Sequence, residues 1–204
     1  MRPFRSVRGS VAVLGRADVD TDQIIPKQFL KRIERTGFGE FLFFDWRLDG
    51  QGRPRPDFEL NAPECAGAKI LLAGPNFGCG SSREHAAWAL QDYGFEVVVA
   101  PSFGDIFATN CFKIGLVTIV LPQAVLRTLI ESAHGGAVAE VDLERQVIVD
   151  PVGREIPFQV DPFRRHCLLN GLDDIARSLE YEQRIAAYEA AHPGRVLTTG
   201  LSAG

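Results

Sequence analysis

The sequence contains few cysteines and no long hydrophobic run, and both absences exclude classes of protein. Its four cysteines form no Cys-x-x-Cys pair, and a chain of 204 residues does not need disulfides to stabilise its core. A cubane iron–sulfur cluster takes several thiolates together, so we expect reduced thiols and no cluster on this chain alone. No segment approaches the ~20 apolar residues of a membrane span, and no signal-peptide pattern follows the first residues. We therefore expect a cytoplasmic protein.

The charge balance also lacks the excess of positive charge that suits nucleic acid. With 22 basic and 26 acidic residues the net charge is −4, and the basic residues do not cluster strongly. A hydrophobic fraction of 46% over this length is enough for a core of its own. We expect one domain over residues 1–192, with a helical end at about 161–192 and a flexible tail at 193–204.

The most informative stretch lies at residues 74–90. The apolar residues 70–73 predict a short buried strand, and a loop with Gly74, Gly78 and Gly80 leads from it to a helix. Glycine lets a backbone take positive φ and approach a ligand closely. A strand, a glycine loop and a helix in this order are typical of an anion site at a helix N-terminus.

Three polar side chains at the end of this loop suit the same chemistry. Ser81 and Ser82 are favourable N-cap residues, whose hydroxyls accept from the free N–H groups of a first helical turn. We place Arg83 in that turn, where a cation faces the positive end of the helix dipole at a cost of ~0.3–1 kcal/mol that a bound anion offsets. Its planar guanidinium matches a carboxylate in bidentate fashion. An ordinary capped helix with an exposed arginine is the simpler alternative.

The string Asn-Phe-Gly-Cys-Gly-Ser-Ser-Arg-Glu-His at residues 76–85 resembles the signature of the swivelling domain of the aconitase superfamily. Within that superfamily the chain is most similar to the free-standing small subunits of bacterial 3-isopropylmalate dehydratases, over roughly residues 1–192. Further segments that carry the resemblance are residues 20–26, 36–39, 43–47, 100–107 and 163–172.

The resemblance implies a fold and an activity. The fold is α/β, a three-layer β/β/α swivelling domain similar to domain 4 of aconitase, with a C-terminal helical extension. The activity is that of a hydro-lyase, which works only with a large subunit and isomerises 2-isopropylmalate and 3-isopropylmalate through 2-isopropylmaleate in leucine biosynthesis. No cofactor is then held by this chain, because the large subunit carries the [4Fe–4S] cluster that binds the hydroxy-dicarboxylate substrate.

The same resemblance assigns roles to individual residues. Ser81 is the base that removes a proton from carbon, while Ser82 and Arg83 bind the substrate. Thr21 and Asp22 belong to the rim of the active site, where Asp22 orients a basic group of another chain. The segment that recognises the variable substituent of the substrate contains Phe29, Leu30, Lys31, Arg32 and Arg35.

Other functions are compatible with parts of this pattern. A related hydro-lyase, either a homoaconitase or a citramalate (methylmalate) dehydratase, would use the same loop and serine. A module that binds an anion without chemistry would use the loop as a phosphate nest. A serine hydrolase is disfavoured, because its Gly-x-Ser-x-Gly turn needs glycine where Arg83 or Glu84 stands. Cys79 is a nucleophile, an iron ligand or a small side chain that fills the loop.

The remaining patterns predict the other elements of the fold. The acidic residues 18–22 predict a polar loop, and the aromatic residues 38–46 a segment that is buried in the core or in an interface. Residues 50–63, rich in proline, predict an irregular connection. Predicted strands are 10–14, 97–100, 116–121, 138–143, 146–149 and 156–160, and predicted helices are 24–33, 102–113, 122–132 and 161–191 with a break at Gly171.

Overall fold

The seven strands form one mixed sheet in the order β4-β3-β2-β1-β5-β6-β7. The computed structural model describes residues 1–31, 36–134 and 136–192. The strands are β1 (Ser6–Leu14), β2 (Ile70–Ala73), β3 (Val97–Ala100), β4 (Val117–Val120), β5 (Val138–Asp142), β6 (Val147–Val149) and β7 (Glu155–Pro157).

Strand β1 belongs to both halves of the sheet. Its second part, from Val11 to Leu14, pairs in parallel with β2, and its first part, from Ser6 to Ser10, pairs antiparallel with β5. The helices α3 (Glu84–Tyr93) and α4 (Asp105–Ile114) join the parallel strands β2, β3 and β4, as the predicted β-α-β-α-β order requires. Helix α5 (Gln123–Ser132) leads from β4 to the antiparallel half.

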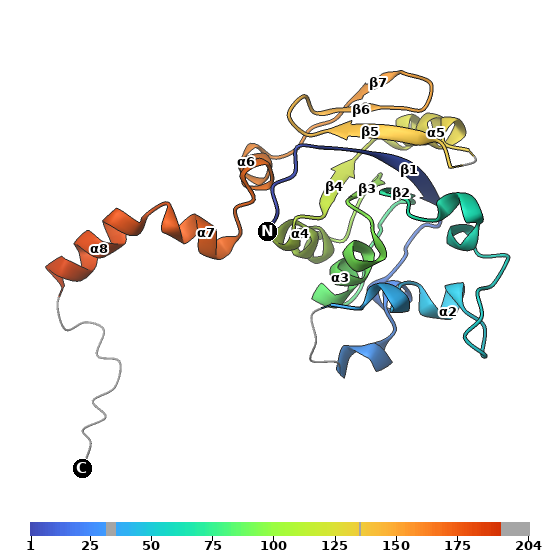
Figure 1. The fold of residues 1–204 in the computed structure, drawn as a ribbon, viewed down its shortest axis with the longest axis horizontal. Coiled ribbons are helices and arrows are strands. Elements are labelled where there is room, and N and C mark those ends of the chain that lie inside the picture. Colours follow the sequence, from blue (N-terminus) through green and yellow to red (C-terminus); the bar gives the residue numbers. More distant parts are fainter. Residues whose placement is uncertain (32–35, 135, 193–204) are drawn as a thin grey trace, which may run out of the picture.

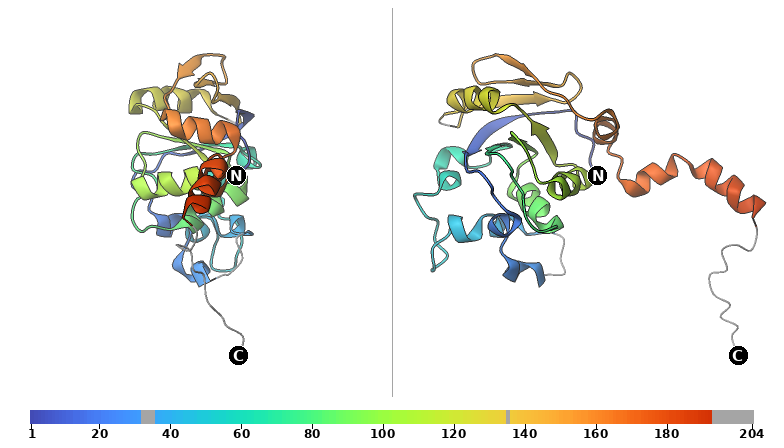
Figure 2. Two further views of the ribbon diagram at one scale, coloured as in Figure 1. Left: turned by 90° about the vertical axis from the view of Figure 1, so that its left-hand side faces the viewer. Right: turned by 180° about the vertical axis from the view of Figure 1, so that it is seen from behind.

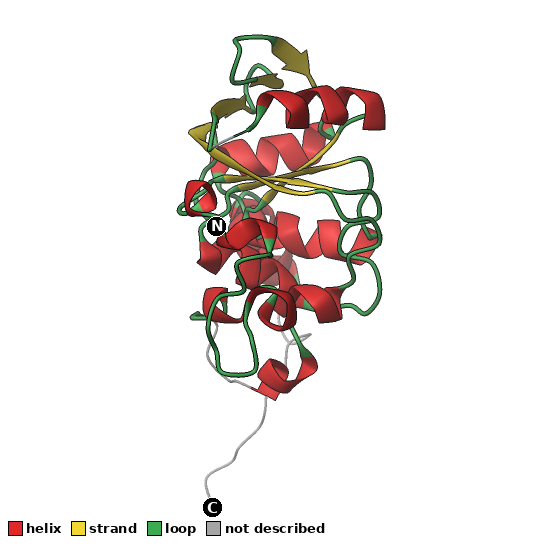
Figure 3. Cartoon of the chain, turned by 90° about the vertical axis from the view of Figure 1, so that its right-hand side faces the viewer, coloured by secondary structure: helices red, strands yellow, loops and turns green. Residues whose placement is uncertain are grey.

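Alternate residues of the parallel strands face two separate cores. In β2, Ile70 and Leu72 pack with α5 and the antiparallel strands, whereas Leu71 and Ala73 pack with the cluster that contains residues of α3 and α4. Figures 1 and 3 show the resulting layers, with the antiparallel strands above the parallel strands and α3 and α4 below them. This arrangement confirms the predicted α/β fold with β/β/α layers.

The C-terminal part is helical, as predicted, and breaks at Gly171. Its helices are α6 (Pro162–Asn170), α7 (Asp174–Leu179) and α8 (Glu182–Ala191). Helix α6 packs on the body, but α7 and α8 extend away from it and have no buried residue (Figures 1 and 2). Within the described residues, no helix is long and apolar enough to cross a membrane.

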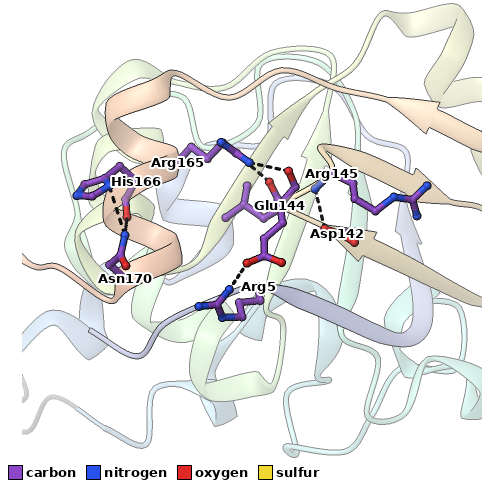
Figure 4. A network of polar contacts seen from close by, with 8 residues as sticks. Arg5, Asp142, Glu144, Arg145, Arg165, His166 and Asn170 are labelled. Atoms are coloured by element: carbon purple, nitrogen blue, oxygen red, sulfur yellow. Dashed lines mark hydrogen bonds and ion pairs between the residues drawn. The ribbon is translucent and has the colours of Figure 1, made fainter.

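A polar network attaches α6 to the turn between β5 and β6 (Figure 4). Arg165 donates through Nε to the carbonyl oxygen of Leu143 (3.1 Å) and through Nη2 to that of Glu144 (2.6 Å). The carboxylate of Glu144 in turn accepts from the guanidinium of Arg5, just before β1. These contacts link three elements that lie far apart in the sequence.

The segment between β1 and β2 differs from its prediction. In place of a helix over residues 24–33, the chain forms a short α1 (Thr21–Ile24) and the 3-10 helix η1 (Lys27–Lys31), and residues 32–35 lie outside the described residues. The predicted polar loop at 18–22 instead contains the start of α1, because Asp20 forms a capping box with Gln23. The further elements are η2 (Gly39–Phe41), α2 (Phe44–Arg47), η3 (Glu59–Asn61) and η4 (Pro63–Cys65).

The aromatic residues 38–46 belong mainly to the core. Phe38, Leu42 and Phe43 are fully buried, and Phe43 stacks on Trp46 with ring centroids 5.9 Å apart. Phe41 remains half-buried. The core alternative of the prediction therefore holds for Phe38, Leu42 and Phe43, whereas Phe44 and Trp46 are half-buried like Phe41.

Candidate active site at the serine loop

Two loops lie side by side at the C-terminal ends of β2 and β3. We call residues 74–83 the serine loop. The N–H of Phe77 donates to the carbonyl of Ser102 (3.1 Å), and the N–H of Gly104 donates to the carbonyl of Phe77 (3.0 Å). The helix predicted over 102–113 begins at Asp105 instead, and the hydroxyl of Ser102 accepts from the N–H of Asn76 (2.8 Å). Ligands of α/β proteins bind preferentially at this edge of a sheet.

The segment from β1 to α1 supports the serine loop from its other side. The N–H of Gly78 donates to the carbonyl of Val19 (2.7 Å), and the N–H of Thr21 donates to the carbonyl of Cys79 (3.0 Å). The hydroxyl of Thr21 donates to the carbonyl of Ser81 (2.8 Å). Thr21 is buried and supports the backbone of Ser81 through this bond, while its predicted place at the rim of the active site stays a prediction.

Two glycines of the loop are required by close packing against the protein itself. A Cβ at Gly78 would lie 2.2 Å from the ring of Phe107, and φ of Gly78 is +74°. A Cβ at Gly74 would lie 2.1 Å from the carbonyl oxygen of Arg16, although φ of Gly74 is not positive. The predicted positive φ is thus confirmed for Gly78 and also holds for Gly80 (+88°), but the space beside Gly74 and Gly78 is filled by this chain and not by a ligand.

The helix after the loop begins two residues later than predicted. Helix α3 starts at Glu84, its N-cap residue is Arg83 in an extended conformation (φ −136°, ψ 110°), and no side chain caps it. The predictions that a serine caps this helix and that Arg83 lies in its first turn are both wrong. Ser81 and Ser82 are exposed, and their hydroxyls bond to no described residue. The N–H groups of Glu84 and His85 are likewise without an acceptor among the described residues, whereas that of Ala86 donates to the carbonyl of Arg83 (3.3 Å).

Arg83 forms a bidentate ion pair with Asp22 of α1. Its Nη1 and Nη2 donate to Oδ1 and Oδ2 of Asp22, the second at 2.9 Å. The side chain of Arg83 is only 9% exposed, against 37% for Asp22. The hydrogen bonds from Arg83 lower the pKa of Asp22 below its ordinary value, so the pair is charged at neutral pH. Within this chain the nearest partner of Asp22 is thus Arg83, and its predicted contact with another chain stays a prediction.

His85 lies one residue inside α3 but faces aromatic side chains. Its ring packs edge-on against Phe38 (5.1 Å between centroids) and lies 4.7 Å from Trp88. Burial lowers the pKa of His85, so the imidazole is neutral at pH 7. No hydrogen bond joins His85 to a serine within the described chain, so the structure does not place it as the base of a serine hydrolase.

The predicted specificity segment is only partly described. Phe29 stacks on Phe41 with ring centroids 4.0 Å apart, Leu30 is half-buried, and Lys31 is exposed. Arg32 and Arg35 lie outside the described residues. The first residue of η1, Lys27, lies 3.7 Å from Oδ2 of Asp22, so this helix adjoins the Arg83–Asp22 pair.

The thiol of Cys79 is poorly suited to be a nucleophile or a metal ligand. Burial raises its pKa, with smaller contributions from Asp20 and Asp18, so the thiolate is disfavoured. All four cysteines are free. Among the described residues, no group of three or more His, Cys, Asp or Glu side chains is placed to bind a metal ion.

Sequence reasoning missed Asn110, a polar residue on the buried side of α4. It is 5% exposed, and its Nδ2 has no hydrogen-bond partner in the part of the chain that the structure describes. The available signal was an asparagine, a poor helix former, in the middle of a helix whose buried neighbours are Phe107 and Cys111.

The fold and the serine loop define a chain of the aconitase C-terminal domain class. The family model described as "Aconitase C-terminal domain" matches residues 1–124, and a second model, LeuD_N, matches residues 127–162. The chain belongs to the family of 3-isopropylmalate dehydratase small subunits, as its most similar curated relatives show.

Two of these relatives illustrate the extent of the similarity. The small subunit of Bacillus licheniformis is 57% identical over 93% of this chain and 96% of its own length. That of Geobacillus kaustophilus is 56% identical over 94% and 98%. A crystal structure of a 3-isopropylmalate dehydratase (LeuD) from Methanocaldococcus jannaschii has a TM-score of 0.65 and 27% identity, and the match covers 90% of this chain and 99% of that chain.

Proposed function

We propose that this chain is the small subunit of a cytoplasmic 3-isopropylmalate dehydratase. Together with a large subunit it isomerises 2-isopropylmalate and 3-isopropylmalate by dehydration to 2-isopropylmaleate and rehydration, a step of leucine biosynthesis. The observation that carries the proposal is the identity to curated small subunits along almost the whole chain. The exposed serines beside an uncapped helix supply the chemistry that such a subunit needs.

Ser81 acts as the base that takes a proton from carbon. A serine hydroxyl is too weak an acid to ionise alone at neutral pH, so its alkoxide needs preorganised donors. The free N–H groups at the start of α3 and the guanidinium of Arg83 are donors of this kind. The bond from Thr21 to the carbonyl of Ser81 holds the backbone that carries this hydroxyl.

Arg83 binds a carboxylate of the substrate. A guanidinium has five N–H donors, and Asp22 accepts from only two of its nitrogens, one bond each. The ion pair with Asp22 fixes the orientation of the guanidinium. Its remaining N–H donors are available to a carboxylate of the substrate. Ser82 contributes a hydroxyl that donates to a substrate oxygen.

The described residues do not fit an iron–sulfur cluster. They provide no set of three metal-binding side chains, and the raised pKa of Cys79 opposes a thiolate. The hydroxide that leaves in a dehydration needs a Lewis acid, and we assign this role to a [4Fe–4S] cluster on the large subunit. The steps assigned to this chain are therefore substrate binding and proton transfer.

Reconstitution tests the proposal. The purified chain is mixed with the large subunit of a 3-isopropylmalate dehydratase from the same cells, and formation of 2-isopropylmaleate is followed by its absorbance. We expect co-purification and turnover of both isopropylmalates, with homocitrate and citramalate turned over poorly. Efficient turnover of homocitrate or citramalate instead would assign the chain to a related hydro-lyase, and no association would refute the proposal.

The isolated chain should contain no iron and show no dehydratase activity. Iron analysis by atomic absorption and the same absorbance assay measure both quantities. Iron at one or more equivalents per chain would contradict the assignment of the cluster to the large subunit.

Docking of the large subunit should involve the surface near η1. Lys27 and Lys31 are exposed beside the Arg83–Asp22 pair, and Phe29 and Phe41 are half-buried. We expect slower hydrogen exchange in residues 27–31 and at the half-buried Phe41 when the large subunit is present. Phe38 and Phe43 are buried already, so their exchange should change little. Unchanged exchange in residues 27–31 and at Phe41 would contradict this docking surface.

A second candidate function is an anion-binding module without chemistry. The uncapped start of α3, with two exposed serines, is the specific observation that favours it. Titration of the isolated chain with inorganic phosphate separates the two functions. Tight phosphate binding together with no turnover in the reconstituted pair would support the module.

A further inference from the structure

Asn110 presents a buried donor without an acceptor. The residue is 5% exposed on α4, and its Nδ2 bonds to no other described group. Buried polar groups in native proteins are almost always paired, and an exception requires an explanation such as a functional role. Replacing such a donor with an apolar group of similar shape is close to neutral for stability when the donor has no partner to lose.

Asn110 lines a hollow that also contains Ser82. The hollow has a volume of about 520 Å³ and lies along α4 and the start of α3. Its other lining residues are Glu84, Asp105, Ile106, Thr109 and Lys113. The unpaired amide and one of the two exposed serines of the serine loop therefore share one space.

The charges of this hollow favour a neutral acceptor for the amide. Glu84 and Asp105 contribute two carboxylates against one cation, Lys113, so a further anion is disfavoured. The hydroxyl of Thr109 is held in place by its bond to the carbonyl of Asp105 within α4 (2.9 Å). The hydroxyl of Ser82 bonds to no described residue, so of the two side-chain hydroxyls that line the hollow it is the one that can turn toward the amide.

We propose that Asn110 is a positioning residue whose Nδ2 donates to Oγ of Ser82 in the working conformation of the serine loop. A hydroxyl that accepts this N–H keeps its own hydrogen for another partner and directs it away from the amide. Ser82 then donates this hydrogen to the substrate oxygen. The inference rests on the proposed function, because it assigns Asn110 a role in the same site.

A double-mutant cycle in the reconstituted enzyme tests this role. Asn110→Leu keeps the approximate shape of the side chain and removes the N–H, and it should lower kcat/KM for 2-isopropylmalate about 3- to 10-fold, the range of one hydrogen bond. In a Ser82→Ala background the same substitution should have less than about a 2-fold effect, because its acceptor is gone. Asn170→Leu, the same exchange at an exposed asparagine of α6, is the control and should leave kcat/KM unchanged.

A second measurement separates positioning from a structural role. Asn110→Leu should leave the urea midpoint of the isolated chain unchanged or raise it, because the amide has no partner there to lose. Equal losses of kcat/KM in both backgrounds, or a lowered urea midpoint, would overturn the proposal. If Glu84→Ala rather than Ser82→Ala abolished the effect, Glu84 would be the acceptor and the proposal would fall.

Different results would refute the proposed function and the role of Asn110. If the wild-type pair formed no 2-isopropylmaleate, the proposed function would fail and the role of Asn110 would fail with it. If the wild-type pair were active but Asn110→Leu lowered kcat/KM equally in both backgrounds, the proposed function would stand and only the role of Asn110 would be overturned.

Discussion

The two halves of the sheet share β1 but differ in the pairing of one buried polar side chain in each, Asp150 and Asn110. In the antiparallel half, Asp150 is 3% exposed, and its carboxylate accepts from the N–H groups of Val152 (3.0 Å) and Arg154 (2.8 Å) and from Nε of Arg154 (2.6 Å). In the parallel half, Asn110 is about as buried, yet its Nδ2 has no partner. The nearby helix α3 has no side-chain cap.

This difference suggests a division of roles, in which the antiparallel half supports the structure and the parallel half carries the function. Polar groups of the antiparallel half bond to one another, so substitutions there should change stability and leave chemistry intact. The parallel half leaves donors and hydroxyls open at the C-terminal ends of its strands, where they can bind a ligand or a partner. Substitutions at that edge should change catalysis more than stability, and the predictions below test this contrast.

The largest effect is expected for Ser81→Ala in the reconstituted enzyme. Loss of a general base typically lowers kcat ~10²–10⁴-fold, and we expect the upper end because water replaces an alkoxide poorly. KM should change little, since Ser81 acts chiefly in the transition state. Steady-state kinetics measure both constants.

The control for this substitution is Ser6→Ala, at an exposed serine where β1 pairs with β5. It should leave both constants unchanged. If Ser81→Ala kept more than about a tenth of the wild-type kcat, on the same general-base scale, the base would have to be sought on the large subunit.

Gly78→Ala should be an exception at this edge, because it should lower stability through packing and backbone strain. The new Cβ would lie 2.2 Å from the ring of Phe107, and alanine would have to adopt φ near +74°. Overpacking and left-handed backbone together cost about 2–5 kcal/mol. Urea unfolding should show this loss, while Gly15→Ala, whose Cβ meets nothing within 4 Å, should stay within about 0.5 kcal/mol. Equal stability of the two variants would contradict the packing argument.

Much of the fold follows from local patterns in the sequence. The runs 70–73 and 97–100 are continuous and apolar because both faces of β2 and β3 are buried, and Gly94 and Gly171 follow the last residues of α3 and α6. The segment after β1 was harder to predict. There an aspartate cap and tertiary contacts, including the stacking of Phe29 on Phe41, replace the α-helix that periodicity favours.

The sequence located the site along the chain but did not predict its three-dimensional arrangement. The motif located Ser81, Ser82 and Arg83, yet the serines are not caps, because Arg83 leaves the helical path to reach Asp22, which is distant in sequence. Asn110 was missed because its environment depends on the packing of α4 beside α3. Long-range contacts of this kind leave no periodic trace in the sequence.

Arg83→Lys should have a smaller effect than either change above. Lysine keeps the charge but not the fork, so it loses a charged hydrogen bond to Asp22 or to the substrate, worth ~1.5–3 kcal/mol, or about 10- to 100-fold in kcat/KM. KM should rise together with a fall in kcat. The pKa of Asp22 is lowered below its ordinary value of 3.8, so this carboxylate stays charged throughout the neutral range. A change of pH within that range should therefore not restore the activity of Arg83→Lys. Arg145→Lys, in the exposed pair with Glu155, is the matched control and should be silent.

The smallest effect is expected for Glu144→Gln in the antiparallel half. Glu144 is paired with Arg5, but the two side chains are 50% and 67% exposed, and exposed ion pairs contribute about 0–1 kcal/mol. The bonds from Arg165 to the backbone of residues 143 and 144 remain, so α6 stays attached to the hairpin. The urea midpoint should therefore shift only slightly and kcat/KM should not change. A large loss of activity with little loss of stability would place chemistry or partner binding on the antiparallel half, and the division between the two halves would then be wrong.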